Sequence, residues 1–197
     1  MDEDRHGAKQ PHRFDPARAA VLDDTARFAY VPPDRVVALL AIPRGATVVD
    51  FGTGTGTYAL EIARRVPHAT VVALDEQPEM LARLVAKPEM AERTNLRAVT
   101  PETMRDYGTV ERVFALNVLH ELGDAALRAL AALLSVDGFA LVVDWNADVV
   151  REFGPPRDHV YGVVQARARL EAAGFAVVAV AGFPFHHAFI ARRVSSR

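Results

Sequence analysis

The residues best suited to ligand chemistry form one glycine-rich segment, Asp50-Phe51-Gly52-Thr53-Gly54-Thr55-Gly56, which follows an apolar run. Glycines let a backbone approach a ligand closely, and a helix that begins after such a loop presents free N–H groups. A second carboxylate, Asp75, ends the next apolar run, about 20 residues after Gly52, where an acid can accept hydrogen bonds from both hydroxyls of a ribose. The segment is therefore a candidate site for a nucleoside.

Two kinds of nucleoside ligand compete for this loop. Dinucleotides favour the spacing G-x-G-x-x-G, whereas here Gly56 comes two residues after Gly54 and Thr57 stands where the third glycine would be. Asp50 at the strand end would repel a diphosphate, but it would attract the cationic amino acid tail of S-adenosylmethionine (SAM). These features favour SAM over a dinucleotide. The alternative is a tight structural turn that binds nothing.

The elements that must position these residues alternate along the chain. Apolar runs predict seven strands, at Ala46–Asp50, Thr70–Asp75, Leu96–Val99, Arg112–Leu116, Phe139–Asp144, Phe175–Ala181 and Ala188–Arg192. Helical spacing predicts helices at Pro16–Tyr30, Tyr58–Val66, Pro78–Ala91, Ala125–Leu134 and Val164–Ala173. A further short helix is predicted to begin near Asp34, which would be its N-cap. This alternation predicts a doubly wound α/β domain covered on both faces. The short link between the last two strands predicts an antiparallel hairpin.

Length and composition narrow the class of protein. A chain of 197 residues, 50% hydrophobic and 24% charged, fits one soluble globular domain. The net charge of -2 disfavours a nucleic-acid partner. The chain has no cysteine, which excludes disulfides, thiolate nucleophiles and cysteine-ligated metals. Because the N-terminus is acidic and no apolar stretch reaches the length of a membrane span, we expect a cytoplasmic protein without a membrane partner.

The glycine motif, together with Asp75 and the following Gln77-Pro78-Glu79-Met80-Leu81, resembles the class I SAM-dependent methyltransferases. The resemblance covers roughly residues 36–192. It implies a Rossmann-like, mostly parallel sheet of strand order 3-2-1-4-5-7-6 with the last strand antiparallel. It also implies SAM as methyl donor and S-adenosylhomocysteine as product. The stretch Leu116–Leu122 resembles the segment after strand four in the small-molecule subgroup.

The resemblance assigns cofactor contacts residue by residue. The loop would hold the methionine portion of SAM, and Asp75 the ribose. Two positions depart from the family pattern, because Glu76 stands where an apolar residue usually packs on adenine and Thr100-Pro101-Glu102-Thr103 replaces a Gly-Asp-Ala-like turn. The predicted cofactor-binding residues are Asp50, Gly52, Thr53, Gly54, Gly56, Asp75, Glu76, Glu102, Thr103 and Asn117.

Candidate catalytic residues follow strands four and five, whose carboxyl ends bind ligands in open α/β sheets. His120 could act as a base, since histidine titrates near working pH, or it could be a structural histidine at a helix start. Asp144 ends strand five beside Trp145 and suits a polar acceptor, or it is a solvated strand end. His159 follows a Pro-Pro turn that could hold it over the pocket or could equally be an ordinary loop. Asn117 either lines the methyl pocket or caps the strand.

The remaining predictions concern organisation and metal. Residues 1–33 are expected to form an N-terminal arm that closes over the cofactor as a lid, with residues 34–197 as the SAM-binding domain. The alternative for the arm is a peripheral helix. No metal is predicted; His120, His159 and His186 could form a metal site only if they converged.

The function predicted from the sequence is methyl transfer from SAM to a small-molecule acceptor by in-line displacement. Two alternatives stay open: methylation of a protein substrate, and a non-catalytic SAM-binding sensor or partner subunit. The sequence predicts neither the acceptor atom nor the oligomeric state.

Overall fold

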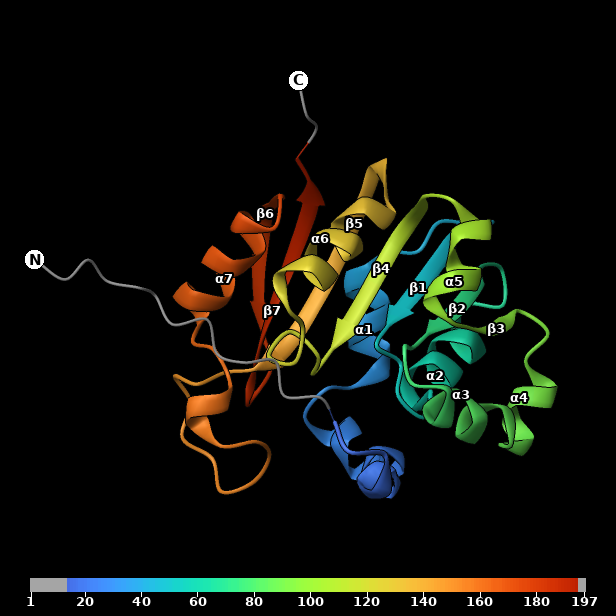
Figure 1. Ribbon diagram of the computed structural model, residues 1–197, viewed down its shortest axis with the longest axis horizontal. Helices are drawn as coiled ribbons and strands as arrows, with labels where there is room; N and C mark the ends of the chain where they lie inside the picture. Colours follow the sequence, from blue (N-terminus) through green and yellow to red (C-terminus); the bar gives the residue numbers. More distant parts are fainter. Residues whose placement is uncertain (1–13, 195–197) are drawn as a thin grey trace, which may run out of the picture.

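A seven-stranded sheet with the order β3-β2-β1-β4-β5-β7-β6 runs through residues 14–194, the part of the chain that the computed structural model describes (Figure 1). β7 is antiparallel to both of its neighbours, and the other pairs are parallel. This confirms the predicted fold. The strands are β1 (Thr47–Phe51), β2 (Thr70–Leu74), β3 (Leu96–Val99), β4 (Val110–Leu116), β5 (Leu134–Trp145), β6 (Phe175–Gly182) and β7 (His186–Arg193).

Helices cover both faces of the sheet because successive strand residues point to opposite sides. Val49 and Val113 belong to one apolar core with residues of α5, α6 and α7, whereas Val48 and Phe114 belong to a second core with residues of α1, α2 and α3. The α-helices are α1 (Pro33–Leu40), α2 (Thr57–Arg65), α3 (Pro78–Val85), α4 (Pro88–Glu92), α5 (Pro101–Met104), α6 (Asp124–Leu133) and α7 (Val163–Ala172). No helix in the described part is long and apolar enough to cross a membrane.

Three local expectations were wrong. Pro16–Tyr30 is not one α-helix but two 3-10 helices, η1 (Pro16–Asp23) and η2 (Thr25–Ala29). The predicted helix Pro78–Ala91 divides into α3 and α4, since proline at 88 lacks the N–H that a continuous helix requires. The N-cap of α1 is Pro32, and Asp34 lies in the first turn. The short elements α5, η3 (Arg105–Tyr107) and η4 (Arg157–His159) were not predicted.

The parallel strands place the candidate site residues at one edge of the sheet. Asp50 near the end of β1 lies opposite Phe114 of β4, so the carboxyl ends of these strands meet. The antiparallel register brings His187 opposite Asp144 and His186 opposite Trp145. The N-terminal segment, which comprises η1 and η2 and is blue in Figure 1, lies at the edge of the sheet to which the arrowhead of β4 points. Such an edge is where open α/β sheets bind ligands.

Candidate active site

The glycine loop between β1 and α2 is held by hydrogen bonds to the strand-end acids. The N–H of Gly54 donates to Asp75 Oδ2 at 2.8 Å, and Thr53 Oγ1 donates to Asp50 Oδ2 at 2.7 Å. Gly54 has a φ of 55°, in the left-handed region that glycine adopts without steric cost. Asp75 Oδ1 also accepts from the N–H of Gln77 at 2.9 Å. The two acids therefore shape the loop as well as facing its concave side.

A cavity of about 650 Å³ opens beside this loop. Its size falls within the range of roughly 300–1,000 Å³ that is usual for small-molecule and cofactor sites. Its wall carries four carboxylates and one guanidinium, those of Asp50, Asp75, Glu76, Glu121 and Arg27. The excess of acidic groups favours a ligand with positive charge.

Seven of the ten predicted cofactor-binding residues line the cavity: Asp50, Gly52, Thr53, Gly54, Asp75, Glu76 and Asn117. The other three lie outside the lining. A Cβ on Gly56 would sit 2.4 Å from Leu84 Cδ1, so this glycine allows α2 and α3 to pack closely. Thr103 belongs to a capping box with Thr100, and Glu102 is exposed on the same short helix.

Burial affects the ionisation of one cavity residue, Asp50, and the hydrogen bonding of another, Asn117. Burial raises the pKa of Asp50 to about 7, although the hydrogen bond from Thr53 and the charge of Arg27 oppose the rise. Asn117 has a φ of 57°, and its buried Oδ1 has no hydrogen-bond partner among the described residues. An unpaired buried acceptor costs free energy, so Oδ1 is suited to accept a donor from a ligand in the cavity.

His120 and Asp144 form a buried pair at the neighbouring strand ends. His120 Nδ1 lies 2.9 Å from Asp144 Oδ1, and the backbone N–H of His120 donates to Asp144 Oδ2 at 2.8 Å. Burial favours the neutral forms, but mutual attraction outweighs it, so the pKa of Asp144 is lowered and that of His120 is raised. Neither residue lines the cavity, whereas Glu121, whose Oε1 lies 3.6 Å from His120 Nε2, does.

The other candidate histidines, all within the described residues, are not brought to the cavity. His159 is exposed in η4 and lies outside the cavity lining. His186 is buried against Trp145, with ring centroids 4.1 Å apart, and His187 Nε2 lies 3.2 Å from the carbonyl oxygen of Tyr161. Across the described ranges, no three His, Cys, Asp or Glu side chains are grouped as metal ligands.

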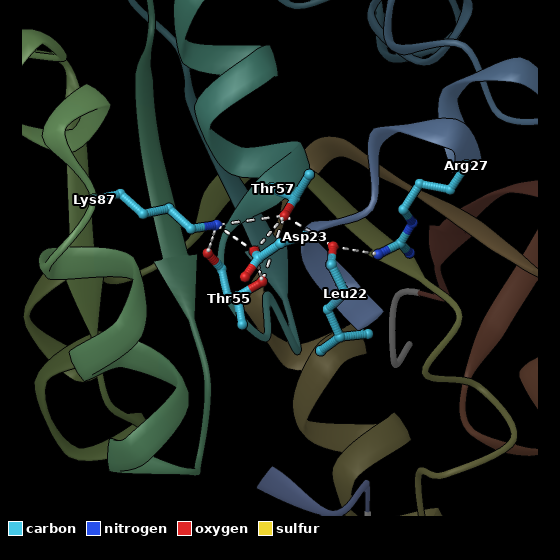
Figure 2. A network of polar contacts seen from close by, with 6 residues as sticks. All are labelled: Leu22, Asp23, Arg27, Thr55, Thr57 and Lys87. Carbon is cyan, nitrogen blue, oxygen red and sulfur yellow. Dashed lines mark hydrogen bonds and ion pairs between the residues drawn. The ribbon is translucent and has the colours of Figure 1, made fainter. Parts of the chain in front are cut away.

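The N-terminal segment is joined to the glycine loop by a network centred on Asp23 (Figure 2). Asp23 Oδ1 accepts from Thr55 Oγ1 at 2.7 Å and from Lys87 Nζ at 2.6 Å, and Lys87 also donates to the carbonyl of Thr55. The adjoining Leu22 lines the cavity and accepts hydrogen bonds at its carbonyl from Thr57 and Arg27. The segment thus forms part of the cavity wall.

Several cavity residues were missed by the sequence reasoning. Met104 lies three residues after Pro101, so both face the cavity from one side of α5, a helix that was not predicted. Glu121 directly follows His120, and this adjacency was the available signal. Arg27 belongs to the segment expected as a lid, but the sequence assigned it no contact of its own. Tyr58 carries no local motif, and only the folded chain places it here.

The strand order and the acids at the ends of β1 and β2 define the Rossmann-like fold of class I methyltransferases. Residues 48–138, a little under half of the chain, match the family described as "Methyltransferase domain". A crystal structure titled as a SAM dependent methyltransferase from Aquifex aeolicus superposes with a TM-score of 0.81 at 27% identity. That match covers 91% of this chain and 98% of the other.

Curated relatives match a shorter part of the chain. A trans-aconitate 2-methyltransferase of Deinococcus radiodurans is 31% identical over 115 residues, which is 58% of this chain and 39% of that protein. The protein of the same name from Mycobacterium tuberculosis (H37Ra) is 31% identical over 111 residues, which is 56% of this chain and 42% of that protein. The chain thus spans about two fifths of the length of these relatives.

Proposed function

We propose that this protein transfers a methyl group from SAM to a small-molecule acceptor and releases S-adenosylhomocysteine. The observation that carries the proposal is the cavity at the strand ends, where Asp50, the glycine loop and Asp75 surround one space. The match of residues 48–138 to the methyltransferase domain family supports the same activity.

The residues present fit SAM. Asp50 and the unpaired Oδ1 of Asn117 are acceptors for the cationic amino acid tail, and the Asp75 carboxylate after β2 is an acceptor of the kind that ribose hydroxyls require. Pro101 and Met104 give the cavity an apolar wall suited to adenine, and Glu76 lines the same cavity. Glu102 and Thr103 lie on the same helix and stay predicted contacts of the adenine edge.

When bound, SAM supplies an activated methyl group, so the protein's task is to align the acceptor and exclude water. We propose that His120, oriented by Asp144, takes the proton of an acceptor that carries one at neutral pH. The hydrogen bond to Asp144 fixes the orientation of the imidazole, which is the usual role of a carboxylate behind a catalytic histidine. His159 stays a predicted acceptor-orienting residue on the neighbouring loop.

The proposed organisation has residues 1–33 as a lid over the cofactor and residues 34–197 as the methyltransferase domain; residues 1–13 and 195–197 lie outside the described part of the chain. The contacts of Leu22, Asp23 and Arg27 with the loop and cavity support the lid. A small-molecule acceptor is supported by the names of the trans-aconitate relatives and by the near-neutral charge of the chain.

A methyl-transfer assay tests the proposal. Purified protein and methyl-labelled SAM are incubated with a panel of O-, N- and S-acceptors, with Gly54→Val as the inactive control because its side chain would block the loop. We expect a labelled product from at least one acceptor with the natural chain and none with the variant. Tight SAM binding without any product would favour the non-catalytic sensor or partner subunit.

A further inference from the structure

Among the described residues, the buried polar side-chain atoms that lack a hydrogen-bond partner lie at one edge of the sheet. The buried side-chain nitrogen and oxygen atoms without a partner belong to Asn117, Arg151, His186 and His187. Asn117 follows β4, His186 and His187 begin β7 opposite the end of β5, and Arg151 lies in the loop after β5. Because buried polar groups are normally paired, this concentration requires an explanation.

The unpaired atoms are of two chemical kinds. Asn117 presents an acceptor, which faces the proposed cofactor cavity and suits the amino group of SAM. Arg151 presents donors at both Nε and Nη2. These two atoms form the edge of a guanidinium that binds a carboxylate through two parallel hydrogen bonds. The ammonium that suits Asn117 cannot satisfy Arg151, so the donors of Arg151 call for an anionic group.

The Arg151 guanidinium lies against the aromatic end of β5. Its central carbon is 5.0 Å from the ring centroid of Trp145, and the opposite partner of Trp145 in the sheet is His186, at 4.1 Å. Asp144 is the acid whose charge acts on Arg151, but the carboxylate of Asp144 accepts its hydrogen bonds from His120 and from the N–H of Trp145. Arg151 is thus held near an anion that is already paired.

Aromatic rings from separate segments complete the surroundings. Phe153 contacts the rings of Trp145, Tyr30 and Phe185, at centroid distances of 5.8, 5.3 and 4.9 Å. Phe153 is 41% exposed, on the same loop as Arg151. A loop side chain that is partly in solvent can make way for a ligand at low cost, which opens space beside the Trp145 ring.

We infer that the methyl acceptor carries a carboxylate, which the Nε–Nη2 edge of Arg151 binds next to the Trp145 ring. This rests on the proposed methyltransferase function. His186 supplies an additional donor, since burial lowers its pKa to about 4 and keeps the ring neutral, with one N–H, at neutral pH. The carboxylate anchors the acceptor beside the His120–Asp144 pair.

Isothermal titration calorimetry tests this subsite in protein saturated with S-adenosylhomocysteine. The probes are benzoate, cinnamate and trans-aconitate, each beside its uncharged amide. We expect at least one acid to bind more tightly than its amide. Arg151→Met should weaken binding of that acid by about 10- to 100-fold and remove the preference, as expected for lost charge-assisted hydrogen bonds. Arg151→Lys, which keeps the charge but not the two-donor edge, should recover only part of the affinity.

The control is Arg167→Met, because Arg167 is exposed on α7 and already paired with Glu171 at 2.9 Å. This variant should keep the full preference for the acid. Equal binding of every acid and its amide, or an unchanged preference in Arg151→Met, would overturn the inference. Binding of S-adenosylhomocysteine is measured first: its absence contradicts the proposed function, whereas its presence without a preference for acids contradicts the carboxylate subsite alone.

Discussion

Asp50 is a carboxylate whose charge depends on what occupies the cavity beside it. Its burial raises the pKa to about 7, so in the free protein half of the molecules carry a neutral Asp50 near pH 7. A cationic ligand favours the ionised form, because opposite charges attract strongly at a buried position. Ligand affinity and the ionisation of Asp50 are therefore linked.

We predict that S-adenosylhomocysteine binds more tightly as the pH rises from 6 to 8. Below the pKa, affinity should fall by up to about tenfold per pH unit, since binding then requires the loss of a proton from Asp50. Calorimetry across this range measures the slope. Asp50→Asn should bind weakly with a much flatter profile. Glu121→Gln is the matched control, because the pKa of Glu121 is also raised to about 7, and it should keep the slope. A flat profile for the natural chain would contradict the role of Asp50.

The His120–Asp144 pair makes a prediction about stability. The lowered pKa of Asp144 gives stability that is present above its ordinary pKa of 3.8 and is lost as the pH falls through the folded value. The raised pKa of His120 gives stability that is present below 6.5 and is lost as the pH rises through the folded value. The pair should therefore stabilise the protein most between about pH 4 and 6.5.

Thermal unfolding of His120→Gln at pH 4 to 9 tests this window. The variant should lose roughly 3–5 kcal/mol near pH 5–6, because it leaves the Asp144 charge buried and unpaired, and the loss should shrink at higher pH. His68→Gln serves as control, since the ring of His68 lies near the Ile42 carbonyl and not a carboxylate. A destabilisation that is independent of pH would show that the pair acts by packing alone.

At the scale of elements, the glycine loop depends on how α2 packs against α3. Gly56, the N-cap of α2, has a φ of 74°, and Leu84 of α3 occupies the space that its Cβ would need. Gly45 has a similar φ of 78°, but a Cβ there would meet nothing within 4 Å. The two glycines share one backbone conformation and differ in their surroundings.

We predict that Gly56→Ala lowers the free energy of unfolding more than Gly45→Ala does. Each variant incurs about 1–2 kcal/mol for a left-handed alanine, and Gly56→Ala must also displace Leu84. Denaturant unfolding of both proteins measures the difference. Equal losses would mean that the contact with Leu84 carries no weight in the packing of α2 on α3.

The proposed lid depends on Asp23, which joins η1 to the loop through Thr55 and to Lys87, two residues after the end of α3. The Lys87 ammonium donates to both Asp23 and the Thr55 carbonyl, so it connects three segments (Figure 2). Removing it should loosen the N-terminal segment without affecting the sheet.

We predict that Lys87→Met speeds the dissociation of S-adenosylhomocysteine and raises hydrogen exchange in residues 16–29. Exchange followed by mass spectrometry, with stopped-flow dissociation, measures both effects. Arg83→Met is a suitable comparison, since its 3.5 Å contact with the Pro16 carbonyl is long and exposed, and it should leave the dissociation rate close to that of the natural chain. If Lys87→Met changes neither quantity, the segment is a peripheral cover and not a lid.

At the scale of the whole molecule, the strands and the two strand-end acids were predictable from local patterns, whereas the strand order came from the resemblance to class I methyltransferases. Apolar runs give the strands, and Asp50 and Asp75 end two of them wherever the sheet forms. The His120–Asp144 pairing could not be predicted as a distance, since it depends on the register of β4 with β5. The adenine contacts of Glu102 and Thr103 stay predictions, and the part played by Pro101 and Met104 could not be predicted because it depends on the helical phase of α5.

The positions of Arg27 and Arg151 could not be predicted from the sequence because they depend on long-range packing. Arg27 reaches the cavity only because the N-terminal segment folds back over the glycine loop, and Arg151 meets Trp145 only because the loop after β5 returns to the sheet edge. Neither arginine has a neighbour in sequence that marks its role. Such residues become candidates once burial and hydrogen bonding are known.

The central claim is that the strand-end cavity binds the SAM skeleton, and calorimetric titration with S-adenosylhomocysteine at pH 8 tests it most directly. We predict one site per chain for the natural protein. Asp75→Ala should weaken binding by ~1.5–3 kcal/mol through the lost ribose hydrogen bonds, and Glu79→Ala, exposed on α3, should leave it unchanged. An absence of binding heat in the natural protein at several temperatures, or equal affinity in Asp75→Ala, would contradict the claim.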